Sequence, residues 1–499
     1  MRRVLPSLAL LAVAATGAAV GSAVTAAADH HGPAAEQQSR LLARSVLAAS
    51  TVRGGSPPTG GFFSANDRKN AADNQVPPDA DAVPPAYFAH QPVQGISATV
   101  PAGDGTWWTL ADNGFGTRES SGDWQLVLYR MDLRFGDARG PAVLESVVLS
   151  DPGGFVPWQT MCDRSHGSAL PPFTFNAFTT PPPPACGADP AARILTGFDF
   201  DPESMQVAGD GTFWIGDEFG PFLLHADRQG RLLQAPVAVP GVTSPQNPTL
   251  DVLHGEAPTV AQSRGLEDLA IDPARTRLYA MTEGAVGTDD PQTLRVRPFD
   301  LEHQRFSRQV GTLRLEMPGG KVDLTGLRLQ DSTPDPADNP RAYPAAVAPT
   351  GVGGESAAEL TAVNDHQFLV VERDSLGDGV PGPRFKKVFL LDDRGRDGGA
   401  LVKTMLVDLM AVPDPNHVGG DGDFFRFPFN TIESVHVVDS DTILVANDNN
   451  YPFSNARSRS LTNARTGPLA ADANEFIEVR LGSTLRVDPR LLDPSVPDD

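Results

Sequence analysis

The sequence predicts an all-β fold, a single β-propeller, in which similar hairpins repeat around a central channel. Five segments share one pattern: a short apolar or alternating strand, a tight polar turn, and a returning strand rich in Trp, Leu, Ile and Val that ends at Glu or Asp. Glycine and proline are abundant, with 48 and 46 among 499 residues, and no amphipathic helical pattern of useful length is present. Repeated hairpins of one polarity indicate radial repetition. Because their spacing is irregular, we expect six blades in total, with seven as the alternative.

The clearest hairpin lies between Gly197 and Leu233, with Glu203 at the start of its first strand and Glu218 at the end of its second. Because the two strands are antiparallel, these positions meet at one edge of the sheet. The other four hairpins carry an acidic or hydroxyl residue at both positions: Ser97 with Asp112, Glu267 with Glu283, Glu359 with Glu372, and Glu433 with Asp448.

Further strands complete the expected blades, and the segment Ser45–Val52 is expected to close the ring. Apolar runs bounded by turn residues predict these outer strands. They are Leu126–Asp132, Ala142–Leu149, Leu223–Ala226, Leu232–Val239, Leu294–Asp300, Gln309–Leu315, Lys387–Asp392, Leu401–Asp408, Glu475–Val479 and Leu485–Val487.

A ring of carboxylates at one channel mouth follows from this arrangement, since equivalent ends of successive blades meet at one face of a propeller. Crowded carboxylates repel unless a cation neutralises them or some keep their protons. One interpretation is a site for calcium or another divalent cation, which prefers oxygen ligands; the other is that each acid caps backbone N–H groups or pairs with Arg. The candidate metal ligands are Asp112, Glu203, Glu218, Glu267, Glu283, Glu359, Glu372, Glu433 and Asp448, with Asn113, Asn447 and Asn449 as neutral oxygen donors.

The net charge of −22 disfavours binding to nucleic acid, because 62 acidic residues face only 40 basic ones and would repel a polyanion. Residues 1–28 have the basic start, apolar run and small-residue end of a secretory signal peptide, and general secretion or twin-arginine export can use such a segment. We expect a flexible leader at 29–42, the propeller domain at 43–499, no transmembrane segment after signal removal, and a secreted monomer.

Two cysteines, Cys162 and Cys186, lie in a Pro-rich insertion at about residues 151–196. Export makes a disulfide the expected state. It would close a loop of about 25 residues and stabilise the fold by on the order of 3 kcal/mol.

Several motifs together resemble the secreted phytase-like proteins described as having the "esterase-like activity of phytase", and more distantly the β-propeller phytases. The resemblance extends over roughly Gly95–Arg480 and implies a propeller that hydrolyses phosphoesters, with calcium as the cofactor of the more distant relatives. The motifs are Gly95-Ile-Ser with Asp112-Asn-Gly, Asp201-Pro-Glu-Ser-Met with Trp214-Ile-Gly-Asp-Glu, Gly265-Leu-Glu-Asp-Leu-Ala with Glu283-Gly, Phe368-Leu-Val-Val-Glu-Arg-Asp374, and Glu433-Ser-Val with Asn447-Asp-Asn-Asn-Tyr-Pro.

For a phosphoester hydrolase we expect a cation-oriented water, a carboxylate base among Asp112, Glu218, Glu283 and Glu372, and Arg118 or Arg373 near the developing charge. The scattered cations that could face a phosphate are Arg118, His225, His254, Arg264, Arg373, Lys386 and Arg457. The alternatives are a non-catalytic extracellular binding propeller with a structural calcium site and a propeller lactonase or carboxylesterase. The G-x-S-x-G, H-E-x-x-H and phosphate-loop motifs are missing, which argues against a serine α/β-hydrolase and a zinc peptidase.

Aromatic and histidine side chains inside the predicted strands are expected to pack rather than to bind. This applies to His436 and to Trp107, Trp108 and Trp214, whose positions favour contacts between blades.

Overall fold

The computed structural model describes residues 38–166, 189–250, 255–316, 356–374, 385–394, 402–420, 422–461 and 469–492. By its contacts the chain divides into residues 1–37 and 38–499, and all described residues belong to the second unit. The predicted signal peptide, Cys186 and His254 lie outside them. No described helix is long and apolar enough to cross a membrane.

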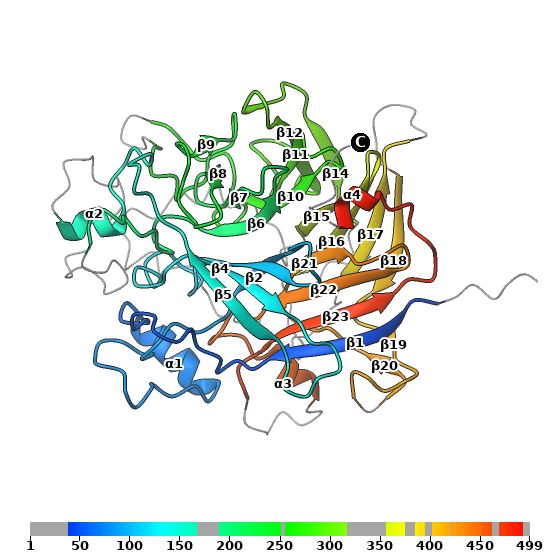
Figure 1. The fold of residues 1–499 in the computed structure, drawn as a ribbon, viewed down its shortest axis with the longest axis horizontal. Coiled ribbons are helices and arrows are strands. Elements are labelled where there is room, and N and C mark those ends of the chain that lie inside the picture. The colour runs from blue at the N-terminus through cyan, green and yellow to red at the C-terminus, as the bar shows by residue number, and fades with distance from the viewer. Residues whose placement is uncertain are drawn as a thin grey trace, which may run out of the picture. The chain divides into compact units, whose positions relative to one another are not determined.

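Five antiparallel sheets of four or five strands form the fold (Figure 1). Blade 1 contains β2 (Ile96–Pro101), β3 (Trp107–Ala111), β4 (Val127–Asp132) and β5 (Ala142–Val148). Blade 2 contains β6 (Pro202–Val207), β7 (Phe213–Asp217), β8 (Phe222–Ala226) and β9 (Val237–Ala238). Blade 3 contains β10 (Leu266–Ile271), β11 (Arg277–Thr282), β12 (Thr293–Asp300), β13 (Arg305–Phe306) and β14 (Gly311–Arg314).

Blades 4 and 5 follow the same order from an inner to an outer strand. Blade 4 contains β15 (Ser356–Asn364), β16 (Gln367–Arg373), β17 (Lys386–Asp392) and β18 (Val402–Asp408). Blade 5 contains β21 (Thr431–Val437), β22 (Thr442–Asp448), β23 (Asn474–Arg480) and β1 (Arg40–Leu47). A separate pair, β19 (Val412–Pro413) and β20 (Phe424–Phe425), precedes blade 5 in the chain.

The inner strands close a ring of five, so the predicted count of six blades, or seven, is wrong for the described chain. β2 contacts β6, β6 contacts β10, β10 contacts β15, β15 contacts β21, and β21 contacts β2. No further blade fits between neighbours that touch. The described segments between blades are loops and short elements, and they account for part of the irregular spacing that suggested an extra blade.

The strand β1 closes the ring by pairing with β23, as expected, but it lies at Arg40–Leu47 and overlaps the predicted strand Ser45–Val52 only at its end (Figure 1). β1 begins at Arg40, inside the predicted leader. It takes the fourth place in blade 5, so the predicted strand at Leu485–Val487 is wrong. The other predicted outer strands are confirmed within a few residues, although β9 keeps only two of the expected eight.

Helices are few and short, as expected: α1 (Ala65–Asp73), α2 (Met161–His166), α3 (Ala456–Leu461) and α4 (Pro489–Leu492). The nine residues of α1 begin with a capping box, in which Ser64 and Asp67 satisfy each other's backbone N–H groups. α2 lies in the predicted insertion and carries the buried Cys162. Since Cys186 is outside the described residues, its pairing with Cys162 stays a prediction.

Buried apolar layers between neighbouring blades hold the ring together, and the tryptophans contribute to them as predicted. Aromatic pairs at these seams add edge-to-face or tilted ring contacts to the burial of apolar area. Ring centroids lie 5.1 Å apart for Trp108 with Phe213, Trp214 with Phe299 and Tyr279 with Phe368, and 5.7 Å apart for Trp107 with His436.

Candidate functional site

A β-bulge occurs near the start of every inner strand. In each case one residue is skipped in the pairing with the second strand of the blade. A bulge bends the strand and re-aims the extra side chain, and bulges recur next to functional sites. The skipped residues are Ser97, Glu203, Glu267, Glu359 and Glu433, the five positions that the sequence pattern selected for the first strands.

The second acidic position of four blades lies at the same end of the sheet. Asp112, Glu218 and Glu283 follow their second strands directly and donate their backbone N–H groups to the residues before the inner strands, at 2.9–3.0 Å. Asp448 pairs with Thr431, the first residue of β21. Gly95 is required opposite Asp112, because its φ is +68° and a Cβ there would lie 2.2 Å from a carboxylate oxygen of Asp112.

Three overlapping groups of carboxylates form the centre of this site, which we term the mouth cluster. Within each group, one oxygen of every residue lies within 4.8 Å of the others. The groups are Asp201, Glu203 and Glu218; Glu203, Glu267 and Glu433; and Glu218, Glu267 and Glu283. Asp112 and Asp448 complete the cluster through their charge interactions with Asp201 and Glu433.

Asp201 is a member that the sequence pattern missed. It lies two residues before Glu203, where the corresponding residue is glycine in blades 1 and 3. The repeat therefore assigned one acid to each first strand and gave no reason to select a second. The motif Asp-Pro-Glu was the available signal, since it places two carboxylates around the bulge.

Arg373 is the principal counter-charge. Its Nη2 lies 3.0 Å from Glu267, 3.3 Å from Glu283 and 3.1 Å from Glu433, and its side chain is 4% exposed. Arg264 adds a second guanidinium, 2.7 Å from Glu283 and 26% exposed. Neutral donors also contribute: Ser97 donates to Glu433 at 3.1 Å and Ser356 to Glu283 at 2.8 Å.

The described part of the cluster is short of positive charge. Two described arginines, Arg264 and Arg373, form ion pairs within this set of eight carboxylates: Asp112, Asp201, Glu203, Glu218, Glu267, Glu283, Glu433 and Asp448. All are buried except Glu203, which is partly exposed. Burial of uncompensated charge is costly, so the cluster must bind either protons or cations.

The electrostatics of the acids agree with this shortage. Burial first, and then neighbouring carboxylates, raise the pKa values of Asp112, Glu203, Glu218 and Glu267 well above their ordinary range, and that of Glu433 to about 8. Burial also raises the pKa values of Asp201 and Asp448 to about 6, although backbone hydrogen bonds from Asn113 and Asn450 oppose the rise. Burial would lower the pKa of Arg373, but the surrounding glutamates raise it.

Several sequence-selected residues lie elsewhere. Glu372 pairs with Lys403 at 2.5 Å and accepts the N–H of Glu316, because β16 continues one residue further and places Arg373 at the cluster instead. Arg118 is buried, donates to the carbonyls of Phe198 and Gln246, and packs over Phe198. Glu359 is buried but belongs to none of the three groups.

The predicted neutral ligands and the other cations have structural partners. The side-chain oxygens of Asn113, Asn447 and Asn449 accept backbone N–H groups. Among the described cations proposed to face a phosphate, Arg264 and Arg373 form ion pairs with the cluster, and Arg118 has a charge interaction with Asp201. His225 stacks on Trp214, Lys386 pairs with Asp374, and Arg457 pairs with Glu475.

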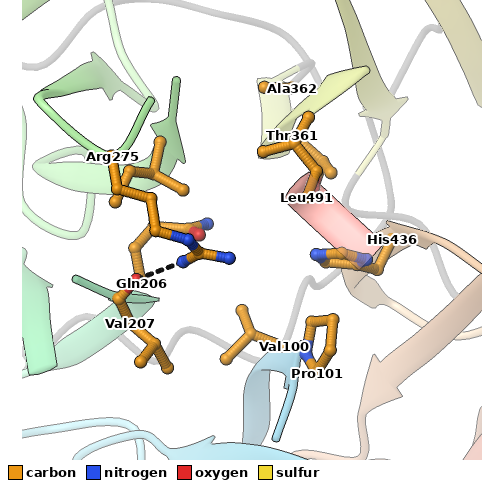
Figure 2. Close-up of a pocket in the computed structure, with 10 residues that line it drawn as sticks. Val100, Pro101, Gln206, Val207, Arg275, Thr361, Ala362, His436 and Leu491 are labelled. Carbon is orange, nitrogen blue, oxygen red and sulfur yellow. Dashed lines mark hydrogen bonds between the residues drawn. The ribbon is translucent and has the colours of Figure 1, made fainter. Parts of the chain in front are cut away.

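The far ends of the inner strands form a different environment, a small pocket (Figure 2). Val100, Gln206 and Thr361 line it, and Leu491 of α4 contributes to its wall. Arg275 and His436 point toward one another across the pocket (Figure 2). Arg275 also donates to the carbonyls of Val207 and Arg490 and so ties α4 to blade 2.

Comparisons with known proteins agree with the earlier resemblance. Residues 91–451 match the family described as "Phytase-like: Esterase-like activity of phytase". A protein of the fungus Arthroderma benhamiae, named "Uncharacterized secreted protein", is 26% identical over 231 residues, which span 39% of this chain and 43% of that protein. The match thus spans less than half of the relative's length.

Solved structures give only weak likenesses. A thermostable family-43 glycoside hydrolase has a TM-score of 0.34 at 8% identity, covering 79% of this chain and 95% of that one. A luciferin-regenerating enzyme has a TM-score of 0.29 at 8% identity, covering 77% of each chain. Scores this low bear on neither fold nor function. The family match covers most of the chain, and the protein belongs to the phytase-like family described by the esterase-like activity of phytase.

Proposed function

We propose that this protein is an exported, monomeric hydrolase of small phosphoesters that depends on a divalent cation, calcium being the best fit, held by the mouth cluster. The observation that carries the proposal is the set of three carboxylate groups within 4.8 Å, with two guanidinium groups as described counter-charges. Family membership favours ester hydrolysis over other chemistries. The secreted name of the fungal relative supports export.

The donor set suits a hard cation, since it consists of carboxylate oxygens and contains no sulfur or imidazole. Glu203 belongs to two of the groups and is the most exposed member, so it would hold the cation nearest to solvent. When bound, such a cation neutralises phosphate charge and orients water for attack.

The remaining residues have distinct tasks. Arg373, whose side chain is buried, holds Glu267, Glu283 and Glu433 in place. Arg264, the more exposed guanidinium, can bind a phosphate oxygen in a charge-assisted hydrogen bond. Asp112 lies outside the three groups and is our candidate for the base that accepts a proton from water.

A substrate panel tests the proposal. The purified mature protein is assayed with an aryl phosphate, phytate, an aryl carboxylester and a lactone, each with calcium and with chelator. We expect calcium-dependent phosphate release and a loss of more than about 10-fold in Glu203→Gln. Asp441→Asn, on the exposed turn before β22, is the control and should keep full activity. Phosphoester turnover that survives both the chelator and Glu203→Gln would contradict the proposal.

A binding propeller with a structural cation is the second candidate, and one observation favours it. Every carboxylate of the cluster except Glu203 is at most 9% exposed, which leaves a substrate little area to contact. Calcium-dependent thermal stabilisation without turnover of any ester would select this function. Turnover of the lactone or carboxylester alone would select the third, a propeller lactonase or carboxylesterase.

A further inference from the structure

A second pair of buried carboxyl groups lies outside the mouth cluster, where blades 3 and 4 meet. Asp268 follows the bulge of β10 and has no exposed area, and Glu359 is the bulge residue of β15 and is 2% exposed. β10 and β15 are neighbouring inner strands. No described group forms a hydrogen bond with any of the four carboxyl oxygens.

The geometry of the neighbouring blade shows where Asp268 points. Ser204 occupies the same position after the bulge in blade 2. Gly216 pairs with Ser204 across the hairpin, and a Cβ at Gly216 would lie 2.3 Å from the Ser204 hydroxyl oxygen. The same Cβ would lie 3.2 Å from the carbonyl oxygen of Leu266 in blade 3, so the Ser204 side chain faces the following blade. By the same repeat, Asp268 faces blade 4. Burial and then the Asp268 charge raise the pKa of Glu359, which agrees with two carboxyl groups in close proximity.

The backbone at Glu359 sets it apart from the other bulge residues. Its φ is +53°, in the left-handed region, whereas Ser97, Glu203, Glu267 and Glu433 have no such angle. A non-glycine residue adopts this conformation at an energetic cost, and it persists where the surroundings fix it. The different backbone agrees with the absence of Glu359 from the three groups of the mouth cluster.

Two buried carboxyl groups without hydrogen-bond donors favour a bound ligand, because solvent does not reach them and the charge of Arg373, which stabilises ionised Asp268, is opposed by that of Glu283. We propose that Asp268 and Glu359 bind a hard divalent cation of the calcium type at the seam of blades 3 and 4. Calcium takes roughly six to eight oxygens, of which the two carboxylates supply up to four. Backbone carbonyls or water would supply the others. Such a cation ties two adjacent blades together and does not depend on any hydrolytic activity of the mouth cluster.

Calcium stoichiometry tests this site in the intact protein. Chelator-treated wild type, Asp268→Asn, Glu359→Gln and the double variant are titrated with calcium by calorimetry, and bound metal is measured after dialysis. The double variant should bind one calcium ion fewer than wild type and lose part of the calcium-dependent rise in melting temperature. Glu203→Gln, which changes only the mouth cluster, should keep the seam ion.

Glu359→Gly is a second test variant for the case that the double variant does not fold. Glycine adopts a positive φ without strain, and the substitution removes the carboxylate. It should melt at or above the temperature of chelated wild type and also lack one calcium ion. The proposal is overturned if the double variant and Glu359→Gly bind calcium with unchanged stoichiometry and affinity. A higher melting temperature of the chelated double variant with unchanged calcium binding would show that the pair shares a proton instead.

Discussion

Buried carboxylates have a full set of cationic partners at one place in the ring and too few at another. At the closure of blade 5, Glu475 receives the guanidinium of Arg44 at 2.8 Å and that of Arg457 at 2.8 Å. Burial would raise its pKa, but the two arginines lower it below the ordinary value. In the mouth cluster, eight acids have two described guanidinium partners and most of their pKa values rise. Full compensation at Glu475 is consistent with a structural role, and the missing compensation in the mouth cluster is the basis of the proposed cation site.

The largest effect is expected at the closure. Glu475→Ala leaves two arginines without their shared partner and removes a link between β1, β23 and α3, which carries Arg457. Breaking a buried ion pair in this way should lower the free energy of unfolding by about 3–5 kcal/mol. Urea denaturation measures it, with half-buried Glu478→Ala on the same strand as the control. Equal stability of the two variants would contradict the structural assignment.

A smaller loss is expected for Arg373→Met in the mouth cluster. The change leaves Glu267, Glu283 and Glu433 without their main partner, so the chelated protein should lose about 1–3 kcal/mol of unfolding free energy. Unlike the closure, the cluster can recruit protons or a cation, and calcium should restore part of the loss. Denaturation with and without calcium measures both values, and a loss that calcium leaves unchanged would argue against cation binding there.

The stability of the chelated protein should depend on pH because the acids of the mouth cluster lack cationic partners. Acids whose pKa is higher in the folded than in the unfolded state favour the folded state when protonated, so their contribution is present at low pH. It should fall as the pH rises from about 4 through the values of about 6 for Asp201 and Asp448 and about 8 for Glu433. Melting curves across this range measure the slope, and saturating calcium should flatten it. A slope that is the same with calcium and with chelator would refute the role of the cluster.

The smallest effect is expected for Glu372→Gln. This buried residue lies outside the mouth cluster, and glutamine can still accept hydrogen bonds from Lys403 and the Glu316 backbone, so the free energy of unfolding should fall by only about 1–2 kcal/mol. Calcium binding should not change, in contrast to Glu203→Gln. Calorimetric titration measures the calcium affinity of both variants. A loss of calcium affinity in Glu372→Gln would show that Glu372 contributes to the cation site after all.

The sequence correctly predicted which strands pair within each hairpin and at which end of the sheet the acids lie. Glu203 and Glu218 already define a hairpin with both acids at one edge, and the same spacing located Glu267, Glu283, Glu433 and Asp448. The number of blades could not be predicted from the sequence. It depends on whether inner strands that are far apart in the sequence, such as β10 and β15, contact each other.

The site itself was predicted in part. Glu372 was selected as a ligand because the pattern expects an acid at the end of each second strand, whereas β16 ends one residue later, at Arg373, which was selected only as a cation near the developing charge. Asp268 was missed because it follows an acid already assigned, and its missing hydrogen-bond partners become visible only when the neighbouring blade covers it. Interactions within one hairpin are encoded locally, but compensation between blades is not.

The pairing of β1 with β23 sets the order in which the protein can mature. Arg44 and Glu475 are separated by 431 positions, so this bond belongs to the class of long-range contacts that slow folding. A chain still emerging from its site of synthesis or export holds earlier blades but has no closed channel. Because the mouth cluster draws acids from blades 1, 2, 3 and 5, a growing chain cannot assemble it until blade 5 is made. The cation proposed for the mouth cluster can therefore bind only after the ring is complete, and calcium-dependent resistance to proteolysis would report its binding.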